Sequence, residues 1–297
     1  HLIFNVVGTI IFLPIIVPGF LGNFVSYFTT DVNRQIANAH TIFNITNTLI
    51  MLPLIPILIK LVTWIIPGED EDEKQGPKYI DDRLLETPVI AAGQVIKETI
   101  RMATKAKKGL VLSIDAFKTN DESLVQKVYE NEKIINILEE SITTYLVKLS
   151  KCELSDKEKN IVAATFHIVN DIERIGDHAE NIAELAKDIV DLEISFSDVG
   201  IGELKDMYNK VVSTYTYALE AMRTSNVELA CKVIKMEEQV DMMEKSCRAN
   251  HMNRLNSSSC SIESGVIYLD IISNLERVSD HAVNIAQQVI AGRIVNK

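Results

Sequence analysis

The sequence lacks the groups on which most catalytic and nucleic-acid-binding sites are built. Its four cysteines include no C-x-x-C pair, so neither a zinc knuckle nor a dithiol redox motif is indicated. It contains no P-loop, no G-x-G-x-x-G turn and no nucleophile paired with a base. The net charge of -11 argues against binding to a phosphate backbone, which needs basic surface. The sequence therefore predicts neither an enzyme nor a nucleic-acid partner.

Charged residues are almost absent from the first part of the chain. Residues 1–66 contain only three formal charges, which are Asp31, Arg34 and Lys60. Two apolar runs, residues 1–30 and 36–59, each reach the about 20 residues that a membrane-spanning helix needs. A short polar turn over residues 29–35 would make them an antiparallel hairpin. The pattern predicts two membrane segments at the end of a transport domain over residues 1–66, with a pair of buried core helices as the alternative.

The two apolar runs also repeat each other. The segment from His1 to Pro14 aligns with the segment from His40 to Pro53 at an offset of 39, and eight of fourteen residues are identical. The identities include polar side chains, which are costly in hydrocarbon and are expected to face protein or a water-filled cavity. Interhelical hydrogen bonding and direct contact with a substrate are both open interpretations. The polar residues of this motif are His1, Asn5, His40 and Asn44.

The repeated phrase H-x-x-F-N-x-x-x-T-x-x-x-L-P resembles the helices that close the membrane domain of bacterial sodium–phosphate cotransporters. The resemblance implies a sodium-dependent phosphate symporter, with inorganic phosphate and Na⁺ as partners, Na⁺ as the coupling ion, and contact with membrane lipid. It also implies a multi-pass location in the cell membrane. That family builds its transport site from Gln-Ser-Ser-rich inverted repeats, and no such segment occurs here. Because the chain starts at His1 inside an apolar run, we expect it to be the C-terminal portion of such a protein.

The chain changes character after Pro67. Residues 67–80 open with a Pro-Gly-acidic run and are predicted to form a solvated linker. No proline follows Pro88, and apolar residues recur at heptad-like spacing. Capping boxes that mark helix starts are predicted at Thr119, Ser155 and Ser225. The predicted helices cover residues 86–118, 121–151, 155–191, 201–224, 226–256 and 261–293.

The six predicted helices form two sets of three. Residues 171–183 align with residues 274–286 at an offset of 103, and an apolar seam repeats with them. Steps of three and four residues keep the seam on one stripe, which must pack against other helices. Its members are Ile168, Ile172, Ile175, Ala179, Ile182 and Ala186, matched by Ile271, Leu275, Val278, Ala282, Ile285 and Val289. The pattern predicts an all-α tandem of two three-helix bundles, with repeats at residues 81–192 and 193–297.

Carboxylate pairs one helical turn apart occur at the same place in both sets. Glu173 and Asp177 in the first set correspond to Glu276 and Asp280 in the second, and both pairs lie off the apolar seam. The neighbouring acid Glu180 is replaced by valine in the second set, so the pairs are kept where other acids are not. A solvated acidic face is the alternative interpretation.

The preceding helix of each set adds further acids. Glu237 and Asp241 pair in the second set, and their counterparts in the first set are Glu132 and Asn136. Like charges one turn apart repel, so a neutralising cation is favoured. Carboxylate oxygens suit hard ions such as Mg²⁺, Ca²⁺, Mn²⁺ or iron. The predicted metal-binding residues are Glu132, Glu173, Asp177, Glu237, Asp241, Glu276 and Asp280.

A histidine follows the aspartate in each set. His178 and His281 point about 100° away from the preceding aspartates, and they are interpreted either as ligands or as groups that bond across the bundle. Arg174 and Arg277 are predicted to pair with local acids.

The repeated E-R-x-x-D-H-A-x-N-I-A segments, with E-x-x-x-D on the preceding helix, resemble the PhoU family of phosphate-uptake regulators. The resemblance implies two repeated three-helix bundles whose E/D-x-x-x-D pairs bind clusters of metal ions, in a cytoplasmic regulatory domain. Asn136 departs from the acidic pattern, so the site that uses Glu132 is expected to be weaker or differently occupied.

Together these features predict the C-terminal portion of a sodium-dependent phosphate symporter, with a PhoU-like metal-binding domain that controls transport. The alternative is a membrane-tethered helical signalling or regulatory protein of phosphate homeostasis that does not itself transport. In that alternative a phosphoacceptor histidine normally precedes its acid, whereas here the aspartate precedes the histidine. A metal-dependent hydrolase is a further hypothesis without a pocket signal. Assembly into a homo-oligomer is left open.

Overall fold

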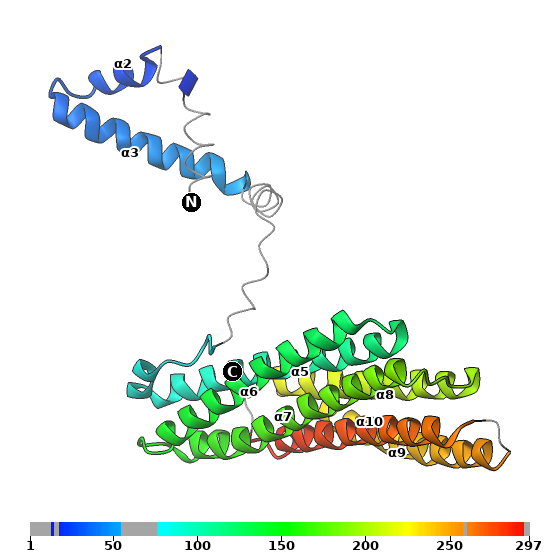
Figure 1. Cartoon of the computed structure of the whole chain (residues 1–297). Helices are drawn as coiled ribbons and strands as arrows, with labels where there is room; N and C mark the ends of the chain where they lie inside the picture. The colour runs from blue at the N-terminus through cyan, green and yellow to red at the C-terminus, as the bar shows by residue number, and fades with distance from the viewer. Residues whose placement is uncertain (1–12, 15–17, 55–75, 258–259, 294–297) are drawn as a thin grey trace. The chain divides into compact units, whose positions relative to one another are not determined.

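The protein is described by a computed structural model, which covers residues 13–14, 18–54, 76–257 and 260–293. The chain divides into two compact units, His1–Glu73 and Lys74–Lys297 (Figure 1). Every regular element in the described residues is helical, which confirms the all-α prediction.

In the described residues of the first unit, the structure has two helices and a short 3₁₀ turn. They are α2 (Phe20–Ser26), α3 (Val32–Met51) and η1 (Leu52–Leu54). Asp31 begins α3, because its side chain accepts a hydrogen bond from the backbone N–H of Asn33. The helices α2 and α3 pack against each other, and Val25 is buried there.

The membrane hairpin predicted for this unit is not supported. Among the helices of the described ranges, none is both long enough and apolar enough to cross a membrane. The physical reason is visible in α3, which is 20 residues long but interrupted by polar side chains along its whole length, such as Arg34 and Asn47. The predicted multi-pass location in the cell membrane is therefore wrong. Residues 1–12 and 55–75, on which much of that prediction fell, lie outside the described residues.

The second unit is a tandem of two three-helix bundles (Figure 1). A 3₁₀ turn, η3 (Asp82–Glu86), leads into it. The first bundle consists of α5 (Pro88–Thr119), α6 (Glu122–Leu149) and α7 (Asp156–Asp191). The second bundle consists of α8 (Asp198–Thr224), α9 (Val227–Asn256) and α10 (Ile262–Ile290). All six helices lie within a few residues of the predicted ranges.

The two bundles share one hydrophobic core. Every residue of the predicted apolar seam is 2% exposed or less. The seam helices α7 and α10 contact each other between the bundles, and α5 contacts α8. Tyr215 on α8 is fully buried, and its hydroxyl donates to the carbonyl oxygen of Ala103 on α5 at 2.9 Å. Burying one large apolar side chain of the seam stabilises a fold by roughly 1.5–3 kcal/mol. Burial of many such side chains in one core therefore accounts for why the two bundles pack as one unit.

Helix capping differs from the prediction at two of three places. The capping box at Ser155 forms. Thr119 is instead the last residue of α5 and Ser225 is the C-cap of α8, so neither can begin the next helix. The side chains of Asp121 and Asn226 accept the first N–H groups of α6 and α9 in their place.

Candidate metal sites on the helical unit

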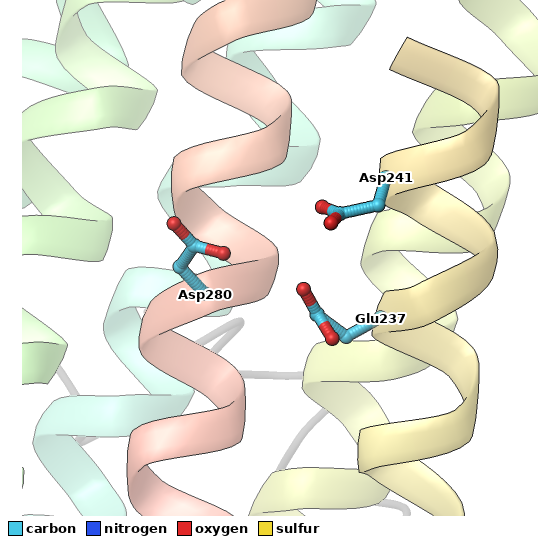
Figure 2. Close-up of side chains that lie close together, drawn as sticks. All are labelled: Glu237, Asp241 and Asp280. Carbon is cyan, nitrogen blue, oxygen red and sulfur yellow. The ribbon is translucent and has the colours of Figure 1, made fainter. Parts of the chain in front are cut away.

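The second bundle carries a cluster of three carboxylates on two adjacent helices. Glu237 and Asp241 lie one turn apart on α9, and Asp280 faces them from α10 (Figure 2). One oxygen from each residue lies within 4.8 Å of the other two. We call these residues the second-bundle cluster. Three oxygens that converge in this way can bind a hard metal ion.

The charges of the second-bundle cluster act on one another. Burial, together with the neighbouring charges of Asp241 and Asp280, raises the pKa of Glu237 to about 7. Burial and the charge of Asp241 also raise the pKa of Asp280. Without a cation, burial and the neighbouring charges therefore make the ionised forms of Glu237 and Asp280 less favourable.

Glu276 lies one turn before Asp280 on α10 and is not one of the three converging residues. Burial and the charge of Asp280 raise its pKa. Its Oε2 atom lies 3.7 Å from Nε of Arg277. The structure thus brings together three of the four residues predicted in this set and leaves Glu276 beside them.

In the first bundle, the acidic residue Glu132 is buried. Glu132 on α6 is 4% exposed, and its Oε1 atom is buried without a hydrogen-bond partner. Burial raises the pKa of Glu132 to about 8, and the charges of Asp177, Glu180 and Glu173 on α7 raise it in the same direction. We call Glu132, Glu173 and Asp177 the first-bundle cluster.

A glycine makes the burial of Glu132 possible. A side chain at Gly176 would collide with Oε2 of Glu132 and would lie 3.1 Å from a methyl group of Ile135. The corresponding residue in the second bundle is Ser279, which is 1% exposed. Sequence reasoning missed Gly176, although the Gly-to-Ser difference inside an otherwise repeated segment was the signal that could have found it.

An arginine occupies the exposed side of the first-bundle cluster. Arg174 contacts Oε2 of Glu173 through Nε at 3.6 Å and Oδ2 of Asp177 through Nη1 at 3.3 Å. These contacts confirm the predicted local pairing of the arginine. Among the described residues, three converging metal-type ligands occur in the second-bundle cluster and not in the first.

The two histidines join the bundles. His178 Nδ1 lies 2.9 Å from Oδ1 of Asn274, and His281 Nδ1 lies 2.9 Å from Oδ1 of Asp171. The two rings stack with centroids 5.7 Å apart. Asn284 also donates to Asp171, at 2.9 Å. Of the two interpretations of the histidines, bonding across the bundles is the one that the geometry supports.

The predicted polar motif of the first unit is described only in part. Nδ2 of Asn44 lies 3.0 Å from Nε2 of His40, one turn earlier on α3, and both residues are exposed. His1 and Asn5 lie outside the described residues.

The helical unit is similar to known proteins in sequence and in structure. The family model described as "PhoU domain" matches residues 99–186 and 204–289, one segment in each bundle. The chain is 31% identical over 179 residues to "Phosphate-specific transport system accessory protein PhoU homolog 1" of Thermotoga maritima, covering 60% of this chain and 76% of that protein. It superimposes on the crystal structure of PhoU from Pseudomonas aeruginosa with a TM-score of 0.63 and 25% identity, covering 66% of this chain and 93% of that one.

A third relative aligns with nearly the whole chain. It is the "Putative inorganic phosphate export protein YjbB" of Salmonella typhimurium, 22% identical over 294 residues, which is 97% of this chain. The chain spans about half the length of that relative, 53%.

Proposed function

The chain belongs to the PhoU domain family, and we propose that it is a regulator of phosphate transport whose helical unit binds hard metal ions. Both bundles carry a match to the family, and a relative covered over 76% of its length is named an accessory protein of a phosphate-specific transport system. Family membership also confirms the prediction that the chain is not an enzyme.

The observation that carries the metal part of the proposal is the convergence of Glu237, Asp241 and Asp280 (Figure 2). Like charges at this separation repel each other, and a bound cation removes the repulsion. A second observation comes from the first-bundle cluster, where the buried Oε1 of Glu132 lacks a hydrogen-bond partner, whose place a metal ion could take. Oxygen donors favour Mg²⁺, Ca²⁺, Mn²⁺ or iron over metals that prefer thiolate.

We propose that the regulated process is the release of inorganic phosphate. Support comes from the relative that aligns with 97% of this chain, because its printed name describes phosphate export. A role in uptake is the second candidate, and it is favoured by the Thermotoga maritima relative, named after a phosphate-specific transport system. Sodium coupling and contact with lipid rest only on the resemblance of the repeated phrase, which occurs from His1 to Pro14 and from His40 to Pro53.

The test uses cells that lack the natural protein and receive either the wild type or the variant Asp241→Ala/Asp280→Ala. Loss of the protein should raise the phosphate content of the cells and slow the release of preloaded radioactive phosphate. The double variant should fail to restore normal release, whereas Asp270→Ala should restore it, since Asp270 is an exposed acid elsewhere on α10. Equal release in all strains would contradict the proposal.

The same strains separate the finer alternatives. Reduced uptake with normal release would favour the uptake role over export. Replacing Na⁺ by choline in the medium tests sodium coupling, which predicts a loss of the protein-dependent flux.

A further inference from the structure

The two acidic clusters are not equivalent, although the bundles that carry them repeat. In the second-bundle cluster, three carboxylates from two helices converge within 4.8 Å. In the first bundle, Arg174 lies against both Glu173 and Asp177, at 3.6 and 3.3 Å. The corresponding Arg277 contacts Glu276 at 3.7 Å, so its ion pair lies one turn away from Asp280. A metal ion in the first bundle would compete with the guanidinium of Arg174 for Asp177. In the second bundle, Asp280 already faces Glu237 and Asp241.

The preceding helices differ in charge at one position. Asp241 supplies a carboxylate one turn after Glu237, whereas the corresponding Asn136 supplies a neutral amide one turn after Glu132. Affinity for hard cations increases with the number of charged ligands and with the rigidity of the site. Over the four matched positions, the first bundle therefore offers three carboxylates, Glu132, Glu173 and Asp177, whereas the second offers four, because Glu276 lies beside the second-bundle cluster.

The third helices also differ at one small residue, which is Gly176 in the first bundle and Ser279 in the second. Gly176 leaves space for Glu132, which is 4% exposed. Ser279 stands at the equivalent position of the second bundle, where Glu237 is partly buried. The Oε1 atom of Glu132 is buried without a hydrogen-bond partner. The Oγ atom of Ser279 is likewise buried without a partner on the turn that carries Asp280.

We propose that the two clusters bind metal ions in order: the second-bundle cluster binds at low metal concentration and the first-bundle cluster only at higher concentration. Asp241 and Asn136 determine the order through the difference of one carboxylate. The protein then has a half-loaded state over an intermediate range of metal concentration, which gives a regulator a graded response to a hard divalent cation. This inference rests on the proposed metal binding of the helical unit.

Titration of the full chain with Mn²⁺ tests the order. Metal is first removed with a chelator, and binding is followed by calorimetry together with the electron paramagnetic resonance signal of free Mn²⁺. The wild type should show two classes of site. Asp241→Asn removes a proposed ligand, so it should weaken the tighter class by at least the about 10- to 100-fold that loss of an outer-shell partner costs, and leave the weaker class in place. Asn136→Asp should strengthen the weaker class toward the tighter one.

The two substitutions are reciprocal and change the charge by one unit in opposite directions. Asn136 is exposed and Asp241 is partly buried on a helix surface, so circular dichroism should report unchanged helix content in both variants. Asp270→Asn removes one exposed acid from α10 outside the clusters and should leave both classes unchanged.

Three outcomes would overturn the inference. A single class of site in the wild type would refute the order while leaving the proposed metal binding intact. Loss of the weaker class in Asp241→Asn, or an unchanged weaker class in Asn136→Asp, would refute the assignment of the classes. Absence of any binding in the wild type would refute the proposed function itself, together with the order that depends on it.

Discussion

The two bundles of the helical unit repeat the same packing but carry different polar sites. Seam positions such as Ile172 and Leu275 are equally buried, at 0% exposed, because both pack in the shared core. Positions off the seam differ between the bundles: Asp171 corresponds to Asn274, and Gly176 corresponds to Ser279. Packing constrains the seam in both bundles alike, whereas each polar position is free to serve a separate task. Substitutions at matched positions therefore separate what the bundles share from what distinguishes them.

The largest effect is expected where the bundles are alike. Ile172→Ala and Leu275→Ala should each lower the free energy of unfolding by about 2–5 kcal/mol, the usual cost of such a cavity. Because the two residues belong to one core, each variant should unfold in a single transition shifted to lower urea concentration. Circular dichroism of the full chain in urea measures this. Two separate transitions, of which only one shifts, would show that the bundles are energetically independent.

The seam was predictable from the sequence because its spacing alone fixes one helix face. The helix starts were less predictable, since Thr119 and Ser225 have the chemistry of N-caps but are used to end the preceding helices. The prediction of a membrane hairpin relied on the small number of formal charges in an apolar run. Uncharged polar residues such as Asn47 also interrupt α3, and the prediction did not take them into account.

The sequence places carboxylates at the positions of both acidic clusters, but it does not show how deeply each side chain is buried. The burial of Glu132 depends on a glycine of another helix, 44 positions later in the chain at Gly176, and only the packed structure brings the two together. The convergence of Asp280 with Glu237 likewise depends on the register between α9 and α10.

A second prediction concerns pH and the more deeply buried acid. The pKa of Glu132 is raised from 4.5 to about 8, so between these values the folded state holds a proton that the unfolded state has lost. Stability from this group is fully present below pH 4.5 and is lost as pH rises through about 8. In metal-free protein, Glu132→Gln should therefore reduce the loss of unfolding free energy as pH rises. Urea unfolding in the presence of a chelator, from pH 5 to pH 9, measures this.

Its matched control in the second bundle is Glu237→Gln. The pKa of Glu237 reaches only about 7, so this variant should change the pH profile less and over a lower range. Identical profiles for the wild type and Glu132→Gln would refute the buried, protonated state of Glu132.

A third prediction concerns the contact between the bundles. Asp171→Ala leaves His281 and Asn284 without their shared acceptor and should cost about 1–3 kcal/mol. Asn274→Ala removes the partner of His178 and should cost less, because a neutral acceptor forms the weaker hydrogen bond. Urea unfolding compares the two variants. A larger loss of unfolding free energy in Asn274→Ala than in Asp171→Ala would contradict the prediction that Asp171 forms the stronger contact between the bundles.

The smallest difference is expected at the matched helix starts. Asp121→Ala and Asn226→Ala each remove an N-cap and should cost about 1 kcal/mol. Asp121→Ala should cost slightly more, because a negative charge at a helix N-terminus adds about 0.3–1 kcal/mol. Raising the salt concentration screens that term, so the two values should converge in thermal unfolding at high salt. A difference unaffected by salt would show that charge is not its cause.

The most direct test of the account is the metal content of the protein. The full chain and the variant Asp177→Ala/Asp280→Ala are purified side by side, exposed to Mg²⁺, Ca²⁺, Mn²⁺ or Fe²⁺, freed of excess ion and measured by mass spectrometry of the elements. The account predicts bound metal in the wild type and little or none in the variant, with unchanged helix content, since both aspartates lie off the buried seam and such changes shift stability by only about 0.5 kcal/mol. Equal metal content in the two proteins would contradict it and leave the carboxylates as a solvated acidic face.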